Sequence, residues 1–73
     1  MSEVEREKQM DELRIQATMA KDLSVAIKAI SALAGFGEEA IHKLETISDP
    51  SGLADNKVKA AANREIEKIK KRT

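Results

Sequence analysis

The sequence predicts an all-α fold: a four-helix fragment of an α-α superhelix, made of two stacked antiparallel helical hairpins. Apolar residues recur at helical spacing along four segments. Ala, Lys, Glu and Ile dominate the composition and proline occurs once, which favours helix over sheet. Capping and turn residues separate the segments. We therefore expect one domain over residues 1–73, with hairpins at about 2–35 and 37–72.

The first helix is expected to begin near Ser2, because Ser2 and Glu5 have the spacing of a capping box. At 100° per residue, one face of this helix carries a core-facing apolar stripe. A second, smaller apolar face holds Val4, Ile15 and Met19. The core-facing stripe consists of Met10, Leu13, Ala17 and Ala20.

The second helix is expected between Asp22, a good N-cap, and Gly35, which is placed to end it. Apolar side chains cover most of its circumference, and one narrow polar arc holds Ser24, Lys28 and Ser31. A helix that is apolar on nearly every side is packed on several sides. We therefore expect this segment to be the buried middle helix.

A third helix is expected from Gly37, where Glu38 and Glu39 complement the helix dipole, to the turn at residues 48–52. Asp55 is expected to cap a fourth helix. The inner faces hold Ala40, Ile41, Leu44 and Ile47 in the third helix, and Val58, Ala61, Ala62, Ile66 and Ile69 in the fourth.

The two hairpins align with each other. Asp22 placed on Asp55 superimposes D-x-x-V on D-x-x-V at an offset of 33 residues, and the first and third helices align at an offset of 31. Repeats of 20 to 50 residues are typical of helical solenoids. The alignment pairs Val25 with Val58, Ala29 with Ala62, Leu33 with Ile66, and Phe36 with Ile69.

The unit D-x-x-V-A-x-x-A-x-x-A-L-x-G-x-G at residues 22–37, followed by E-E-A-I-x-x-L at residues 38–44, resembles HEAT repeats of the phycobilisome-lyase-like type. Residues 55–70 resemble a closing repeat, in which polar side chains replace outward core positions, as Asn63 replaces Ile30. The resemblance implies a scaffold that binds proteins. A minority of the family binds nucleic acid or modifies chromophore-carrying proteins.

Composition removes several classes of function. The net charge is +0, from 13 basic and 13 acidic residues, so the whole-molecule charge predicts no attraction to nucleic acid or to a membrane. No apolar run approaches the roughly 20 residues that span a bilayer. The absence of cysteine fits a reducing compartment, and we expect a cytoplasmic protein. With no Tyr or Trp, little could stack bases or hold a cofactor or small-molecule substrate.

The titratable residues form no catalytic or metal-binding pattern, so we expect neither an enzyme nor a metal or cofactor site. His42, the single histidine, lacks the Cys or second His that such sites need. Within the acidic pairs at 11–12 and 38–39, neighbouring side chains diverge by about 100° around a helix. The Gly-Phe-Gly segment at 35–37 precedes two glutamates that would repel a phosphate, which indicates a tight link instead.

Two surfaces are candidate binding sites. Val4, Ile15 and Met19 point away from the core on a first helix that a partner or a second copy could cover, since two repeats are fewer than such folds usually need. On the fourth helix, four cations lie within about 60° along roughly 21 Å. This ridge would meet an acidic partner or a phosphate backbone, although charge runs are usually solvated faces. We call it the basic ridge: Lys57, Arg64, Lys68 and Lys71.

The leading prediction is a non-catalytic protein–protein interaction module, a small HEAT-repeat scaffold whose partner is another protein or a second copy bound through the first helix as a homodimer. The alternative is a small nucleic-acid-binding protein that uses the basic ridge. Four phosphate contacts would give a slope of about −3.6 in log K against log salt.

Overall fold

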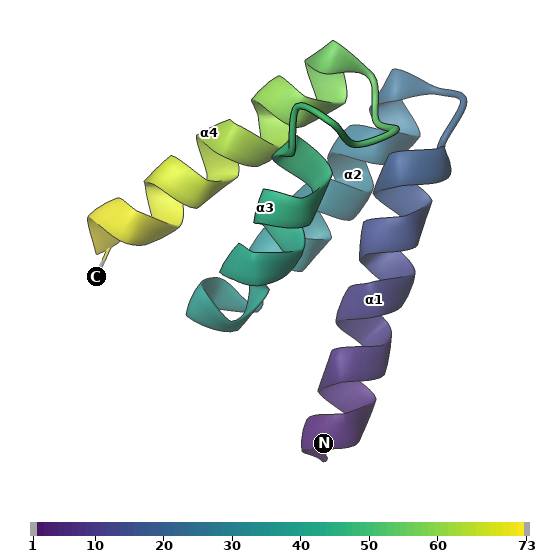
Figure 1. Cartoon of the computed structure of the whole chain (residues 1–73). Helices are drawn as coiled ribbons and strands as arrows, with labels where there is room; N and C mark the ends of the chain where they lie inside the picture. The colour runs from purple at the N-terminus through teal and green to yellow at the C-terminus, as the bar shows by residue number, and fades with distance from the viewer. Residues whose placement is uncertain (1, 73) are drawn as a thin grey trace.

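The structure, a computed structural model, describes residues 2–72, which form four α-helices and one 3-10 helix and contain no strand. Helices α1 (Glu3–Met19) and α2 (Leu23–Ala34) make one antiparallel hairpin. The 3-10 helix η1 (Gly37–Ala40) leads into α3 (Ile41–Ser48), which makes the second hairpin with α4 (Asn56–Arg72). Figure 1 shows the two hairpins, and the predicted all-α fold of two stacked hairpins is confirmed.

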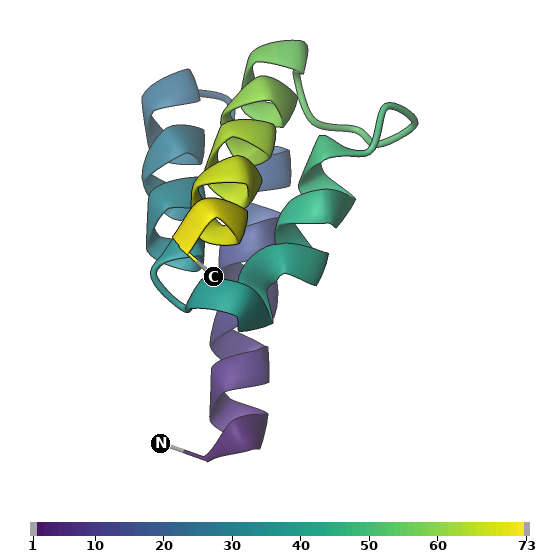
Figure 2. The ribbon, with the colours of Figure 1, turned by 90° about the vertical axis from the view of Figure 1, so that its left-hand side faces the viewer.

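The hairpins stack so that like helices lie together. α1 packs beside α3 and α2 packs beside α4, while α2 and α3 also touch across the centre. Viewed from the side of the C-terminus, α2 and α4 stand next to each other and run in the same general direction (Figure 2). The fold therefore has two helix layers, an α1–α3 layer and an α2–α4 layer.

The predicted N-caps at Ser2 and Asp22 are confirmed. The Glu5 backbone N–H donates a hydrogen bond to Ser2 Oγ at 3.2 Å, and the Ser24 backbone N–H donates to Asp22 Oδ1 at 3.0 Å. These side chains satisfy N–H groups that a first helical turn leaves without backbone partners.

Gly35 ends α2 as predicted, whereas the third helix, expected from Gly37, begins with the 3-10 helix η1 before α3 starts at Ile41. Gly35 follows α2 but keeps a right-handed helical conformation, with φ of −62°. The chain reverses two residues later at Gly37, whose φ of +76° is the left-handed conformation that glycine adopts without a Cβ clash. Phe36 between them packs half-buried against the core.

The core is built largely from small side chains. Its largest fully buried members are Met10, Ile30, Leu33, Leu44 and Ile47, to which all three of α1, α2 and α3 contribute. Alanines at the helix contacts let the axes approach closely, since interaxial distance depends on the side chains between them. The buried alanines are Ala17, Ala26, Ala29, Ala34, Ala40, Ala54 and Ala62.

The expectation that α2 is packed nearly all round is only half right. Ile30 and Leu33 are at most 1% exposed, but Leu23, Val25 and Ile27 are 36%, 40% and 42% exposed. Helices α1 and α4 flank α2 and α3 touches its inner side, so its outer side stays open to solvent.

The internal alignment also fails at one pair, because Val58 is 4% exposed whereas its counterpart Val25 is 40% exposed. Val58 lies on the side of α4 that faces α2, and the corresponding side of α2 is covered by no helix within residues 2–72. The opposite change occurs where Ile30 is buried and its counterpart Asn63 is exposed.

Candidate functional site: the α2–α4 face

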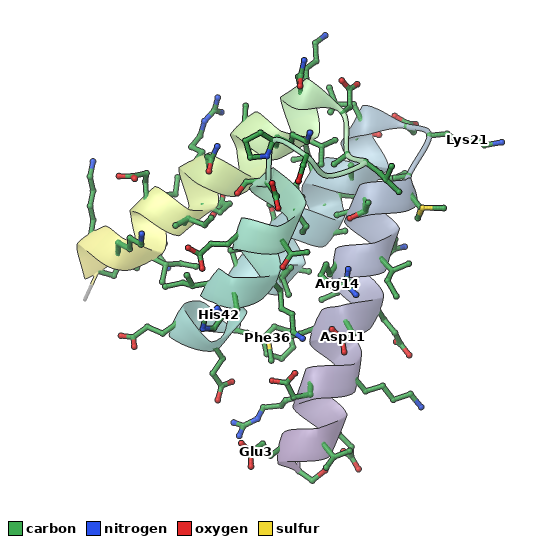
Figure 3. The ribbon with its side chains drawn as sticks, in the orientation of Figure 1. Glu3, Asp11, Arg14, Lys21, Phe36 and His42 are labelled. Atoms are coloured by element: carbon green, nitrogen blue, oxygen red, sulfur yellow. The ribbon has the colours of Figure 1, made fainter. Side chains whose placement is uncertain are left out.

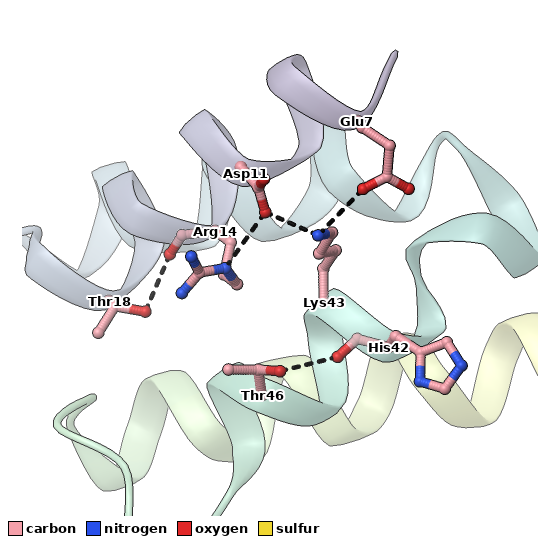
Figure 4. Close-up of polar contacts among 7 residues, drawn as sticks. All are labelled: Glu7, Asp11, Arg14, Thr18, His42, Lys43 and Thr46. Atoms are coloured by element: carbon pink, nitrogen blue, oxygen red, sulfur yellow. Dashed lines mark hydrogen bonds and ion pairs between the residues drawn. The ribbon is translucent and has the colours of Figure 1, made fainter. Parts of the chain in front are cut away.

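A cluster of charged side chains joins α1 to α3 (Figure 4). Lys43 Nζ lies 2.7 Å from Asp11 Oδ1 and 3.2 Å from Glu7 Oε2. The hydrogen bond from Lys43 lowers the pKa of Asp11, and the hydrogen bonds to Asp11 and Glu7 raise the pKa of Lys43. Lys43 is mostly covered, with 21% of its side chain exposed. The cluster links the hairpins, and both carboxylates face a cation rather than an open cleft.

No local pattern predicts this cluster, since 32 residues separate Asp11 from Lys43. A second contact of the same kind joins Arg6 to Glu39 at 3.7 Å. Both contacts lie within the α1–α3 layer.

The predicted second face of α1 does point away from the core. Val4, Ile15 and Met19 are 78%, 51% and 68% exposed. However, 11 residues separate Val4 from Ile15, which is roughly 16 Å along a helix, so the three side chains form no compact patch. Self-association through this face stays a prediction.

The basic ridge is exposed at all four positions. The side of α4 that faces α3 is marked by Lys59, whose Nζ donates a hydrogen bond to the Pro50 carbonyl at 2.9 Å. At 100° per residue, the ridge residues lie about 120° to 180° around α4 from Lys59. The ridge therefore stands on the solvent face of α4, roughly opposite the buried side that holds Val58, Ala62 and Ile66. One ridge member, Lys68, contacts Glu65 Oε1 at 3.4 Å.

Two exposed apolar side chains of α2 border the same surface. Leu23 and Ile27 lie one turn apart, within about 60° of Ile30 around α2. Ile30 is buried whereas its counterpart Asn63 in the last hairpin is exposed, so we infer that this side of α2 faces the second hairpin. Val25 lies on the other side of α2, which no helix within residues 2–72 covers. Sequence reasoning missed this pair because it treated every apolar position of α2 as core. The sequence signal for their exposure was that Leu23 and Ile27 lie next to the polar arc of Ser24, Lys28 and Ser31. We call the combined surface the α2–α4 face: Leu23 and Ile27 of α2 together with Lys57, Arg64, Lys68 and Lys71 of α4.

The zero net charge conceals a strong separation between the layers. Helices α1, η1 and α3 carry eight acidic and four basic residues, a net charge of −4. Helices α2 and α4 carry two acidic and eight basic residues, a net charge of +6. The connecting segments hold the remaining −2. The field outside the α2–α4 layer is thus positive although the whole chain is neutral.

An open groove between α3 and α4 lies on another side of the molecule. Glu45 and Asp49 line it from α3 and the following turn, and Glu67 and Lys70 line it from α4. Asp49 accepts hydrogen bonds from the Ser51 backbone N–H and hydroxyl, and these lower its pKa. The groove mixes both signs of charge.

The other singled-out residues take structural or surface positions (Figure 3). His42 is 94% exposed at the start of α3, with Nδ1 3.7 Å from Glu45 Oε1. Glu38 and Glu39 are exposed on η1. Among residues 2–72, no three His, Cys, Asp or Glu side chains are grouped so as to hold a metal ion.

No helix within the described part of the chain combines the length and apolar character that crossing a membrane requires. Comparisons with protein-family models, curated proteins and solved structures gave no match.

Proposed function

We propose that this chain is a non-catalytic protein-interaction module that binds an acidic partner protein through the α2–α4 face. The separation of charge between the layers carries the proposal, because an acidic surface is attracted to the +6 layer while the −4 layer lies on the far side. Leu23 and Ile27 add apolar area that a protein partner would bury and a simple polyanion would not.

We also propose that the two hairpins are HEAT-like repeats and that the domain acts as a scaffold. The stacking of α1 on α3 and of α2 on α4 supports this, since stacked hairpins with like helices adjacent are the unit of helical solenoids. The exposed side of α1 that holds Val4, Ile15 and Met19 would remain free to contact another protein or a second copy.

Binding of a fluorescent poly-glutamate peptide of roughly 20 residues, followed by anisotropy, tests the proposed face. Lys57→Gln with Lys68→Gln should weaken binding several-fold at low salt, and added salt should remove most of the difference. Lys8→Gln with Lys21→Gln is the matched control, because it removes the same charge outside the α2–α4 layer. Equal loss in the two double variants would contradict a localised face.

Nucleic acid is the second candidate partner, and the exposed line of four cations on α4 favours it. Against it, proteins that bind single strands use aromatic side chains to stack bases, and the one aromatic residue, Phe36, is half-buried against the core. We therefore expect a single-stranded DNA oligonucleotide of matched charge to bind more weakly than the acidic peptide. Tighter binding of the oligonucleotide, with a steep salt slope, would favour this second function.

A further inference from the structure

We infer that the α2–α4 face recognises an acidic amphipathic helix, with apolar side chains one turn apart seated against Leu23 and Ile27. The inference rests on the proposed function and specifies the partner's chemistry. The first support is spacing, because Leu23 and Ile27 are four residues apart and present two apolar contacts along one line of α2. A helix whose own apolar residues recur at i and i+4 matches this spacing.

The second support is the arrangement of charge beside that apolar line. The ridge runs along α4 for roughly 21 Å, about four turns of helix, and every member is exposed. Lys68 keeps 55% of its side chain exposed even while it contacts Glu65. Carboxylates that flank the apolar stripe of a bound helix would lie over these cations. A partner with one acidic and one apolar stripe is thus complementary to both halves of the face.

The third support is the contrast with Val25. Val25 is as exposed as Ile27, at 40% against 42%, but at 100° per residue it lies about 160° from Ile27 around α2, on the side that no helix within residues 2–72 covers. Substitutions at Ile27 and Val25 can therefore distinguish a contact on the ridge side of α2 from a general effect of exposed apolar side chains on α2. This pair supplies a test that charge neutralisation alone cannot.

The experiment compares two fluorescent peptides of identical composition and roughly 18 residues, measured by anisotropy. One places Leu on a single helical stripe with Glu on both flanks, and the other is scrambled so that no stripe forms. The amphipathic peptide should bind at least about fivefold more tightly, and Ile27→Ser should remove most of that advantage while Val25→Ser should not. Circular dichroism of each variant checks that these exposed substitutions leave the fold intact.

The outcomes separate the inference from the proposed function. Equal binding of the two peptides, with both weakened by Lys57→Gln and Lys68→Gln, would overturn the amphipathic helix and leave the acidic partner standing. No binding of either peptide would overturn both. A concentration-dependent rise in mass that Ile27→Ser abolishes would assign the face to a second copy, and preferential binding of an oligonucleotide of matched charge would assign it to nucleic acid. Either result would overturn the inference.

Discussion

The two helix layers contain the same kinds of charged residue and use them differently. In the α1–α3 layer, Lys43 lies between Asp11 and Glu7 and is largely covered. In the α2–α4 layer, the basic ridge lies on the outer side of α4, and Lys68 is its only member with an ion pair inside residues 2–72. A lysine in this fold therefore takes its role from whether carboxylates of the neighbouring helix face it. One layer uses charge to join hairpins, and the other presents charge to solvent.

Removing a buried core side chain should reduce stability the most, because both layers depend on the same apolar core. Leu33→Ala should lower the free energy of unfolding by about 2–5 kcal/mol, because Leu33 is fully buried where α2 meets its neighbours. Leu23→Ala on the same helix should cost only about 0.5 kcal/mol, since Leu23 is 36% exposed. Urea unfolding followed by circular dichroism measures both. Similar losses in the two variants would mean that Leu23 belongs to the core and not to the α2–α4 face.

The next effect compares one lysine from each layer. Lys43→Met should lower the melting temperature by about 5 °C, because it removes the contacts with Asp11 and Glu7 that join α1 to α3. Lys57→Met should leave the melting temperature within about 2 °C, since Lys57 is exposed on the ridge. Thermal unfolding at low salt makes the comparison. A larger loss in Lys57→Met would contradict the assignment of the two roles.

The smallest expected effect is the pH dependence of the stability that the Asp11–Lys43 contact contributes. The pKa of Asp11 is lowered in the folded state from its ordinary value of 3.8, so its stabilising contribution is present above that value and disappears as the pH falls through the folded pKa. The pKa of Lys43 is raised from 10.5, so its contribution is present below 10.5 and is lost only as the pH rises through the higher folded value.

Asp11→Asn should therefore be less stable than the unmodified chain at neutral pH and equally stable well below pH 3.8. In a Lys43→Met background most of this difference should disappear, and the remainder comes from Arg14, whose Nε lies 3.7 Å from Asp11 Oδ1 and also lowers the pKa of Asp11. Asp49→Asn is the control, because the pKa of Asp49 is lowered chiefly by Ser51 and its effect should persist in that background. Thermal unfolding across the pH series decides, and an undiminished effect of Asp11→Asn in Lys43→Met would refute the link.

Much of the fold could be predicted from local signals. The caps at Ser2 and Asp22, and the apolar stripes of α3 and α4, depend on neighbours a few residues away, and the structure has them where they were expected. Gly35 ends α2 as expected, and the left-handed residue is Gly37, two positions further on, for which the local sequence carried no separate signal.

The candidate site was only half predictable. The basic ridge follows from the spacing of four cations on one helix, and the structure exposes all four. Leu23 and Ile27 could not be assigned to it, because an apolar residue on a mostly apolar helix is exposed only if no neighbour covers it. The net charges of +6 and −4 likewise could not be assigned to two layers in advance, because the assignment requires the pairing of α1 with α3 and of α2 with α4.

Mapping the contact surface by NMR decides whether the α2–α4 face binds an acidic partner. An acidic amphipathic peptide is titrated into the labelled chain, and the shifts of each backbone amide are followed. We predict that the shifts concentrate on the outer sides of α2 and α4, around Ile27 and Arg64, while those around Asp11 and Lys43 stay nearly unchanged. Shifts of equal size in both layers, or shifts centred on α1, would contradict a binding face built on the α2–α4 layer.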